Sequence, residues 1–326
     1  MSCSGTDRQR DMESLKPEAQ RYIYRTHGVC PREIHFCIQE EVLKEVTFMG
    51  GGCPGNASLV SRLLAGRHLD EIPRLLDGIQ CRDDTSCPDQ LLRALVAARE
   101  GILRPAGSFV VREEKGPKRR VGLMAHLCGD VEALKVSLSD MRGKGVEAVV
   151  CLGELTGGGG EDAAVLRSLK EEDVLAAHGP GDWDKAQELG SQFLGPLTEE
   201  ERDYFLSLPQ AVQFNLAGRR AFGFFGEYLQ GLPGFSDYEP FALEINTVCS
   251  LSRFLQDQEV FPALEAMAFQ FQAQIIFFAQ IKQWGHWRVG GIDFISLGPS
   301  RDWKEVTWGL VEDVAGEVSF EVQRIP

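Results

Sequence analysis

The chain has 326 residues, of which 43% are hydrophobic, and a formal net charge of −14. This length and composition predict about two folded domains with full hydrophobic cores. The negative charge would repel the phosphate backbone of a nucleic acid and an anionic membrane, so we expect neither as a partner. The polar start and the lack of an apolar run of about 20 residues predict a soluble, cytoplasmic protein.

The N-terminal third predicts a mobile polar arm followed by a small α+β domain over 20–102. Its apolar residues alternate as in a β-hairpin and then recur with helical spacing. We expect Leu59, Leu63 and Leu64 to share the buried face of the first helix. In chain order, the predicted elements are an arm over 1–19, strands over 34–39 and 43–49, a glycine-rich turn over 50–56, and helices over 57–66, 69–79 and 86–100.

Nine cysteines, five of them between residues 30 and 87, direct attention to the chemistry of this domain. An odd count without a secretory signal argues against a disulfide framework. Cys53 and Cys87 lie at predicted helix starts, where free N–H groups favour a thiolate. With Cys30 and Cys81 they supply four thiols that suit zinc, or an iron–sulfur cluster as the second candidate. The alternative is that these small side chains only pack at helix starts.

Two smaller interpretations concern the same domain. Cys37 alternates with apolar neighbours and is expected to point away from the buried face, so it is left out of the thiol site. Ser86 is expected to cap the third helix, with Asp89 as its capping-box partner.

The blocks YIYRTHGVCPREIHF, VTFMGGGCPGNASLVSRLLAG and LLDGIQCRDDTSCPDQLLRAL make residues 20–99 resemble the TSCPD domain family, whose name is spelled at residues 85–89. The resemblance implies that Cys30, Cys53, Cys81 and Cys87 are the marker thiols. The family also occurs at the end of cobalamin-dependent ribonucleotide reductases. Their catalytic barrel does not fit in this chain, so the resemblance implies at most an accessory role in ribonucleotide reduction.

After a charged linker over 103–119, strands and helices alternate, which predicts an α/β domain over 120–326. The first strand ends in VGLMAHLCGD. His126 and Cys128 therefore follow the carboxyl end of a strand, where α/β proteins commonly place their binding and catalytic residues. The predicted strands cover 120–125, 146–153, 173–179, 221–227, 272–281 and 291–298, with a hairpin over 306–325 and helices over 130–145 and 162–170.

The segments RVGLMAHLCGDVEALKVSLSDM, VEAVVCLGELTGGG and VLAAHGPGDWD resemble the calcineurin-like metallophosphoesterases, and the likeness covers roughly 118–326. It implies a β-sandwich with flanking helices and, in active enzymes, two metal ions that activate water. The family motifs D-x-H, G-D, G-N-H-D, H-G and G-H-x-H fall here on other residues: His126 and Cys128, Gly153 and Glu154, Gly179 to Asp182, Phe225 and Gly226, and Ala279, Gln280 and Lys282.

With nearly every ligand replaced, the resemblance implies that the two-metal mechanism cannot run. One explanation is loss, in which the fold persists as a scaffold. The other is replacement, in which His126, Cys128 and Glu154, joined by His178 or Asp182, hold one zinc and leave a residual single-metal phosphoesterase. We expect loss, and therefore no catalytic residues.

The interpretation that unites both domains is a non-catalytic metal- and thiol-binding regulatory or scaffold protein. Its C-terminal domain is expected to bind a nucleotide or a protein partner without cleaving it. The glycine run over 156–162 could approach a phosphate through backbone N–H groups, although a flexible loop is the simpler expectation.

Overall fold

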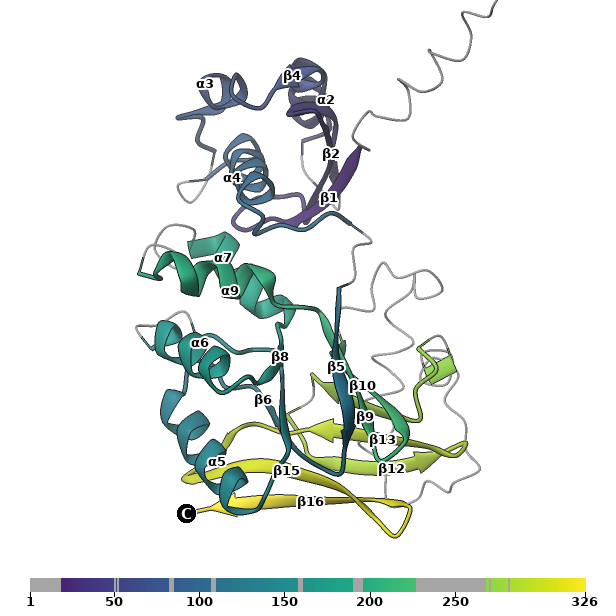
Figure 1. Cartoon of the computed structure of the whole chain (residues 1–326). Coiled ribbons are helices and arrows are strands. Elements are labelled where there is room, and N and C mark those ends of the chain that lie inside the picture. The colour runs from purple at the N-terminus through teal and green to yellow at the C-terminus, as the bar shows by residue number, and fades with distance from the viewer. Residues whose placement is uncertain are drawn as a thin grey trace, which may run out of the picture. The chain divides into compact units, whose positions relative to one another are not determined.

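The computed structural model describes residues 19–49, 51, 53–81, 85–106, 110–157, 161–189, 196–226, 268–269, 271–280 and 282–326. It divides into two compact units, Met1–Ser108 and Phe109–Pro326, which are described separately (Figure 1). Almost all of the predicted arm, Cys3 and Cys249 lie outside the described residues.

Among its described residues, the first unit contains a small antiparallel sheet and the helices α2, α3 and α4. Its strands pair in the order β1-β2-β3-β4. The predicted hairpin is confirmed, and its turn is made by Glu40 and Glu41, both with positive φ. The elements are β1 (Gln20–Arg25), β2 (Glu33–Gln39), β3 (Val42–Met49), α2 (Pro54–Leu64), β4 (Arg67–His68), α3 (Ile72–Leu76) and α4 (Cys87–Arg99).

Two sequence predictions about this unit are wrong. Leu64 is buried in α2, but Leu59 and Leu63 are 56% and 58% exposed, because the helix turns its opposite side toward the domain. Cys37 is only 8% exposed. The pairing of β2 with β3 shifts register between Cys37 and Ile38, so strict alternation of the two faces fails at this point.

The second unit contains two sheets. One has the strand order β12-β13-β11-β10-β9-β5, and the other has β14-β15-β6-β7-β8 with β16 paired to β15. Its elements are β5 (Val111–Lys118), β6 (Arg120–Ala125), α5 (Val131–Gly143), β7 (Ala148–Leu152), α6 (Asp162–Glu171), β8 (Leu175–Ala177), α7 (Pro180–Leu189), α9 (Glu199–Ser207), β9 (Ala211–Leu216), β10 (Arg219–Phe225), β11 (Ile275–Ala279), β12 (Gly285–Val289), β13 (Ile292–Leu297), β14 (Arg301–Asp302), β15 (Glu305–Val314) and β16 (Glu317–Ile325).

The core of this unit lies between the two sheets. Alternate residues of both sheets form one buried cluster, in which Phe214 of β9 and Phe277 of β11 stack at 5.5 Å. On the outer side of β6, Met141 of α5 packs directly over Gly122, and α6 lies beside α5 (Figure 1). The expected α/β sandwich with flanking helices is therefore confirmed.

The parallel strands β6, β7 and β8 end at the same edge of their sheet. Ala125 pairs with Leu152, which pairs in turn with Ala177. The residues that follow these strands therefore start from adjacent positions, and the N–H of His126 donates to the carbonyl of Gly153 at 3.2 Å. This register brings the polar segments after the three strands together.

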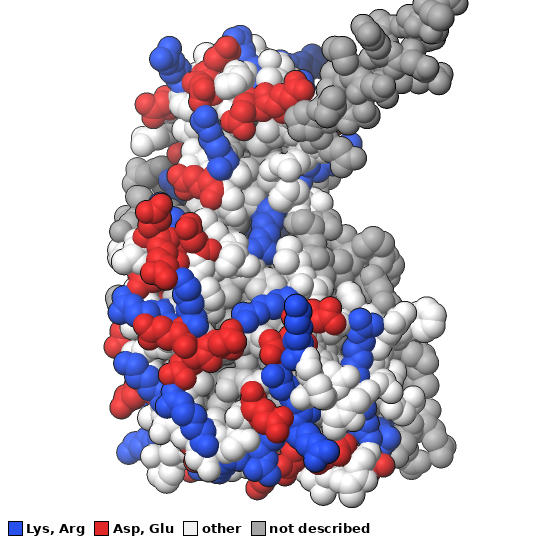
Figure 2. Space-filling view, in the orientation of Figure 1, with Lys and Arg blue, Asp and Glu red and all other residues white. Residues whose placement is uncertain are grey.

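Two further features are the hydrophobicity of the described helices and the distribution of charged side chains. None of the helices in the described part of the chain is both long enough and apolar enough to span a membrane. Figure 2 shows basic and acidic side chains interspersed over the viewed face of the described residues. The net negative charge is thus not gathered on that face into a single acidic field.

Candidate functional site

Three loops of the first unit carry the four predicted thiols. Cys30 lies in the loop between β1 and β2, Cys53 is the N-cap residue of α2, Cys81 lies in the segment before α4, and Cys87 is the first residue of α4. All four are free, and Cys87 is less exposed than the other three. The cysteines are thus brought to loops and helix starts rather than into the core.

Close backbone contact joins the first loop to the glycine-rich turn before Cys53. The N–H of Arg32 donates to the carbonyl of Met49 at 2.8 Å. A Cβ atom on Gly51 would lie 2.8 Å from the carbonyl oxygen of Cys30, so only glycine fits at this approach. The loops that carry Cys30 and Cys53 are therefore adjacent.

The same first loop also touches the segment that carries Cys87. The N–H of His27 donates to Oε1 of Gln90 at 3.0 Å. Gly28 has a φ of +68°, and a Cβ atom there would come within 2.9 Å of Cγ2 of Thr85. All three loops consequently converge at one end of the unit.

The pKa of Cys87 is influenced by its burial and by the other thiols. Burial raises the pKa of this thiol, and the neighbouring thiols of Cys30, Cys81 and Cys53 raise it further. The donors are thus near one another, but among the described residues no group of three or more Cys, His, Asp or Glu side chains stands in position to hold a metal ion. The structure brings the loops that carry the four thiols to one end of the unit without setting ligand geometry.

The segment at residues 85–89 builds the start of α4. Oγ of Ser86 accepts from the N–H of Asp89 at 3.1 Å, as expected of an N-cap. The carboxylate of Asp89 accepts from the hydroxyl of Thr85 at 2.7 Å. In the expected capping box, it would accept from the N–H of Ser86 instead. These polar residues fix the turn from which Cys87 begins the helix.

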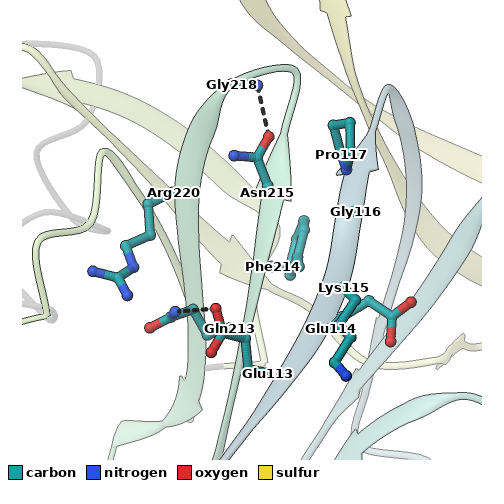
Figure 3. Close-up of a pocket in the computed structure, with 10 residues that line it drawn as sticks. All are labelled: Glu113, Glu114, Lys115, Gly116, Pro117, Gln213, Phe214, Asn215, Gly218 and Arg220. Atoms are coloured by element: carbon teal, nitrogen blue, oxygen red, sulfur yellow. Dashed lines mark hydrogen bonds between the residues drawn. The ribbon is translucent and has the colours of Figure 1, made fainter.

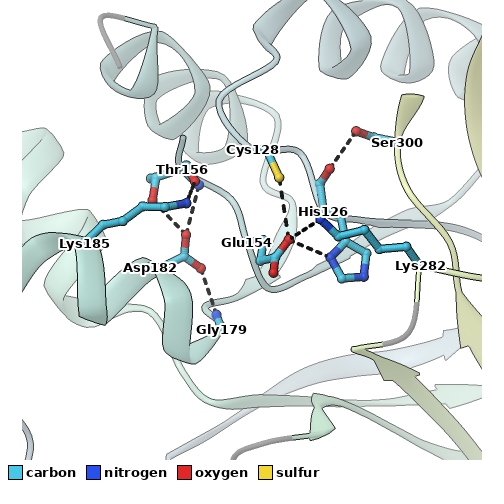
Figure 4. A network of polar contacts seen from close by, with 9 residues as sticks. All are labelled: His126, Cys128, Glu154, Thr156, Gly179, Asp182, Lys185, Lys282 and Ser300. Atoms are coloured by element: carbon cyan, nitrogen blue, oxygen red, sulfur yellow. Dashed lines mark hydrogen bonds and ion pairs between the residues drawn. The ribbon is translucent and has the colours of Figure 1, made fainter. Parts of the chain in front are cut away.

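A second cluster lies at the strand ends of the second unit (Figure 4). Oε2 of Glu154 lies 2.9 Å from Nδ1 of His126 and 3.2 Å from Nζ of Lys282. The thiol of Cys128 donates to the same oxygen at 3.6 Å. Three of the residues that the sequence singled out are therefore together, with Lys282 as a fourth.

The residues of this cluster shift one another's pKa values. The hydrogen bond from His126 and the positive charge of Lys282 lower the pKa of Glu154 from 4.5 to about 2, against the effect of burial. Burial and the nearby Glu154 carboxylate raise the pKa of Cys128. The cluster therefore holds an ionised carboxylate and a thiol that keeps its proton.

The backbone of this cluster is strained. His126, Cys128 and Glu154 have φ values of +54°, +49° and +47°, in the left-handed region that favours glycine. Each such residue costs on the order of 1 kcal/mol or more, and such residues gather at functional sites. The His126 side chain is 1% exposed, and its Nε2 has no hydrogen-bond partner among the described residues.

The other two candidate ligands point elsewhere. The buried carboxylate of Asp182 accepts from the N–H and hydroxyl of Thr156, at 2.9 and 2.8 Å, and from the N–H of Gly179 at 2.8 Å (Figure 4). Nε2 of His178 accepts from the indole of Trp183 at 2.5 Å. Both residues form hydrogen bonds near the start of α7, and neither of them contacts the side chain of Glu154.

Phe225, at the end of β10 in the opposite sheet, fills the space beside His126. The two rings meet edge to face at 5.8 Å. A Cβ atom would lie 2.0 Å from the Phe225 ring if added to Gly153, and 3.2 Å from it if added to Gly179. An aromatic ring therefore packs against the glycines that follow two of the strands.

A hollow of about 730 Å³ lies along β5, β9 and β10, on strands other than those that carry the cluster (Figure 3). Among its lining residues, the amide oxygen of Gln213 accepts from the guanidinium of Arg220 at 3.0 and 2.9 Å. The glycine run over 156–162, for which the sequence suggests contact with a phosphate, is only partly described, because residues 158–160 lie outside the described ranges.

Comparison with known proteins gives one match by sequence family. Residues 12–98 match the TSCPD domain model, which confirms the resemblance of the first unit. No curated protein matches the chain.

Solved structures similar to the chain include a metallophosphoesterase from Sphaerobacter thermophilus, at 15% identity and a TM-score of 0.42, covering 64% of this chain and 89% of that one. A hypothetical protein from Pyrococcus horikoshii OT3 has 15% identity and a TM-score of 0.44, covering 66% and 88%. Vps29 from Entamoeba histolytica, solved with zinc, has 14% identity and a TM-score of 0.33, covering 63% and 98%.

Proposed function

We propose that this protein is a non-catalytic metal- and thiol-binding protein with a regulatory or scaffold role. The TSCPD domain would bind zinc through Cys30, Cys53, Cys81 and Cys87. The observation that supports this best is the convergence of three separate loops on Cys87, since chain segments far apart in sequence bring thiols to one place.

The donor set suits a soft cation. Four thiols match the structural zinc sites of proteins, with an iron–sulfur cluster as the second candidate. Cys53 and Cys87 lie at helix N-termini, where the helix dipole favours the thiolate that metal binding requires. At Cys87, burial and the neighbouring thiols outweigh this effect and raise the pKa, so a metal ion would have to displace the thiol proton. Cys30, Cys53 and Cys81 are exposed on loops, so binding would draw them toward Cys87 and cross-link the loops.

The C-terminal domain would act by binding rather than by catalysis. Its strand-end cluster holds a lysine and a packed phenylalanine, and Asp182 is engaged with backbone N–H groups. A protein or nucleotide partner is the class of ligand that we propose for this domain. An accessory role in ribonucleotide reduction, which the TSCPD resemblance implies, stays a prediction.

Metal analysis tests the thiol site directly. The full chain, purified without oxygen, should contain about one zinc per molecule, and Cys53→Ser and Cys87→Ser should each lose most of it. Cys37→Ala is the matched control in the same domain and should keep the metal, as should His126→Ala. A wild type without zinc or iron, or a Cys53→Ser variant that keeps its metal, would overturn the proposal.

A phosphodiesterase assay with added manganese tests the second half of the proposal. We expect the wild type to show no turnover above background. Turnover that disappears in Glu154→Gln would show that the C-terminal domain is an enzyme.

A further inference from the structure

The strand-end cluster of the C-terminal domain contains the donor types of a metal site. An imidazole, a thiol and a carboxylate converge on one point, Oε2 of Glu154. Such a set commonly surrounds a cation. The structure already places a cation at this oxygen, the ammonium of Lys282 at 3.2 Å.

We infer that the ammonium of Lys282 takes the position of a metal ion at Oε2 of Glu154, so that this carboxylate is neutralised without one. The inference rests on the proposed non-catalytic role of the C-terminal domain but not on the thiol site of the first unit. It makes the cluster a permanent polar link between the segments after β6 and β7 and the segment before β12.

The hydrogen bonds of Glu154 support this assignment. The same oxygen, Oε2, is shared by His126 Nδ1, the Cys128 thiol and Lys282. The single carboxylate charge is balanced by the lysine, so a second, divalent cation would meet a group that is already neutralised.

The space around the cluster supports the same conclusion. Phe225 packs against His126 and against the backbone of Gly153 and Gly179. An ion placed there would need several oxygen, nitrogen or sulfur ligands or waters, and the ring offers none. The ring of Phe225 thus takes up space beside the imidazole of His126, whose Nε2 has no hydrogen-bond partner among the described residues.

A double-mutant cycle tests whether Lys282 and Glu154 form an ion pair that stabilises the folded protein. Unfolding by urea is measured for Lys282→Met, Glu154→Gln and the double variant of the full chain. The matched control is the exposed pair of Lys170 and Glu200, which lie 2.7 Å apart in the same domain. The Lys282 side chain is 57% exposed, but Glu154 is 27% exposed, whereas Glu200 of the control pair is 78% exposed. We expect the Lys282–Glu154 coupling to change the unfolding constant by about fivefold, and the control coupling to change it by less than about twofold.

Thermal unfolding with millimolar Mn²⁺ completes the test, because manganese prefers oxygen ligands and binds thiols poorly. The wild type should show no Mn²⁺-dependent shift of its melting temperature. A shift that Glu154→Gln abolishes, or a coupling no larger than that of the control pair, would overturn the inference. A manganese shift without phosphodiesterase turnover would overturn this inference alone, whereas turnover would overturn the proposed function as well.

Discussion

Nδ1 of His126 and Oε2 of Glu154 lie 2.9 Å apart, and both residues have left-handed backbone conformations. They follow two neighbouring parallel strands, β6 and β7, so their side chains join the ends of these strands across the sheet. Because His126 is buried, its ring depends on this carboxylate for a polar partner. The stability of the second unit should therefore depend on the ionisation of Glu154.

The first prediction concerns acid unfolding. The pKa of Glu154 is lowered to about 2 in the folded protein. A carboxyl with a lowered folded pKa contributes stability above its unfolded pKa near 4.5 and loses this contribution as the pH falls toward 2. We expect Glu154→Gln to lower the free energy of unfolding at pH 7 by up to about 3 kcal/mol. The difference in this free energy between the variant and the wild type should become smaller as the pH falls from 4.5 to 2.

Urea unfolding at a series of pH values measures this effect. Glu321→Gln, at an exposed position on β16, serves as the control and should follow the wild type throughout. A constant difference between Glu154→Gln and the wild type from pH 7 to pH 2.5 would contradict the assigned ionisation.

The second prediction concerns the phenylalanine beside the cluster. Phe225→Ala should lower the free energy of unfolding by about 3 to 5 kcal/mol, because it leaves a cavity over Gly153 and Gly179. Phe225→Leu fills part of that space and should cost less. Chemical denaturation measures both variants, and equal losses for the two would show that the ring is not closely packed.

The third prediction concerns Asp182. Asp182→Ala should destabilise the second unit by on the order of 3 kcal/mol, because it leaves the N–H groups of Thr156 and Gly179 without their acceptor in a buried place. Asp203→Ala, at an exposed position on α9, is the control and should change stability little. A loss in Asp182→Ala no larger than in this control would show that the buried bonds contribute little.

The sequence predicts β6, β7, β8, β10, β11 and β13 and the helices α5 and α6, because alternation and helical spacing are local signals. It misses β5, which lies inside the segment expected to be a linker, and β9. His126, Cys128 and Glu154 follow adjacent parallel strands, so their meeting also follows from the strand order. The position of Asp182 outside this group does not follow from the sequence, because the sequence does not reveal which polar side chains turn back to the start of their own helix.

Other features of the structure depend on contacts distant in sequence. Lys282 lies far along the chain from Glu154, and its place in the cluster had only the phosphoesterase resemblance to indicate it. The burial of Cys37 follows from a register shift between β2 and β3. Such a shift changes which side chains face inward without leaving a local pattern in the sequence.

The fourth prediction concerns the reactivity of the thiols. Cys30, Cys53 and Cys81 are exposed and should be alkylated rapidly by iodoacetamide in the absence of metal. Cys151 should react slowly, because it is buried and burial raises its pKa. If the thiol site binds zinc, added zinc should slow alkylation at the exposed three without changing Cys128, which is also exposed in the other unit.

Peptide mass spectrometry after timed alkylation measures each cysteine separately, so Cys3 and Cys249 do not obscure the result. Protection confined to Cys30, Cys53, Cys81 and Cys87 would identify a shared site, since these residues lie on three loops and no single loop could shield them all. Protection of Cys128 to the same extent would instead indicate that zinc acts at the strand-end cluster, against the role inferred for Lys282.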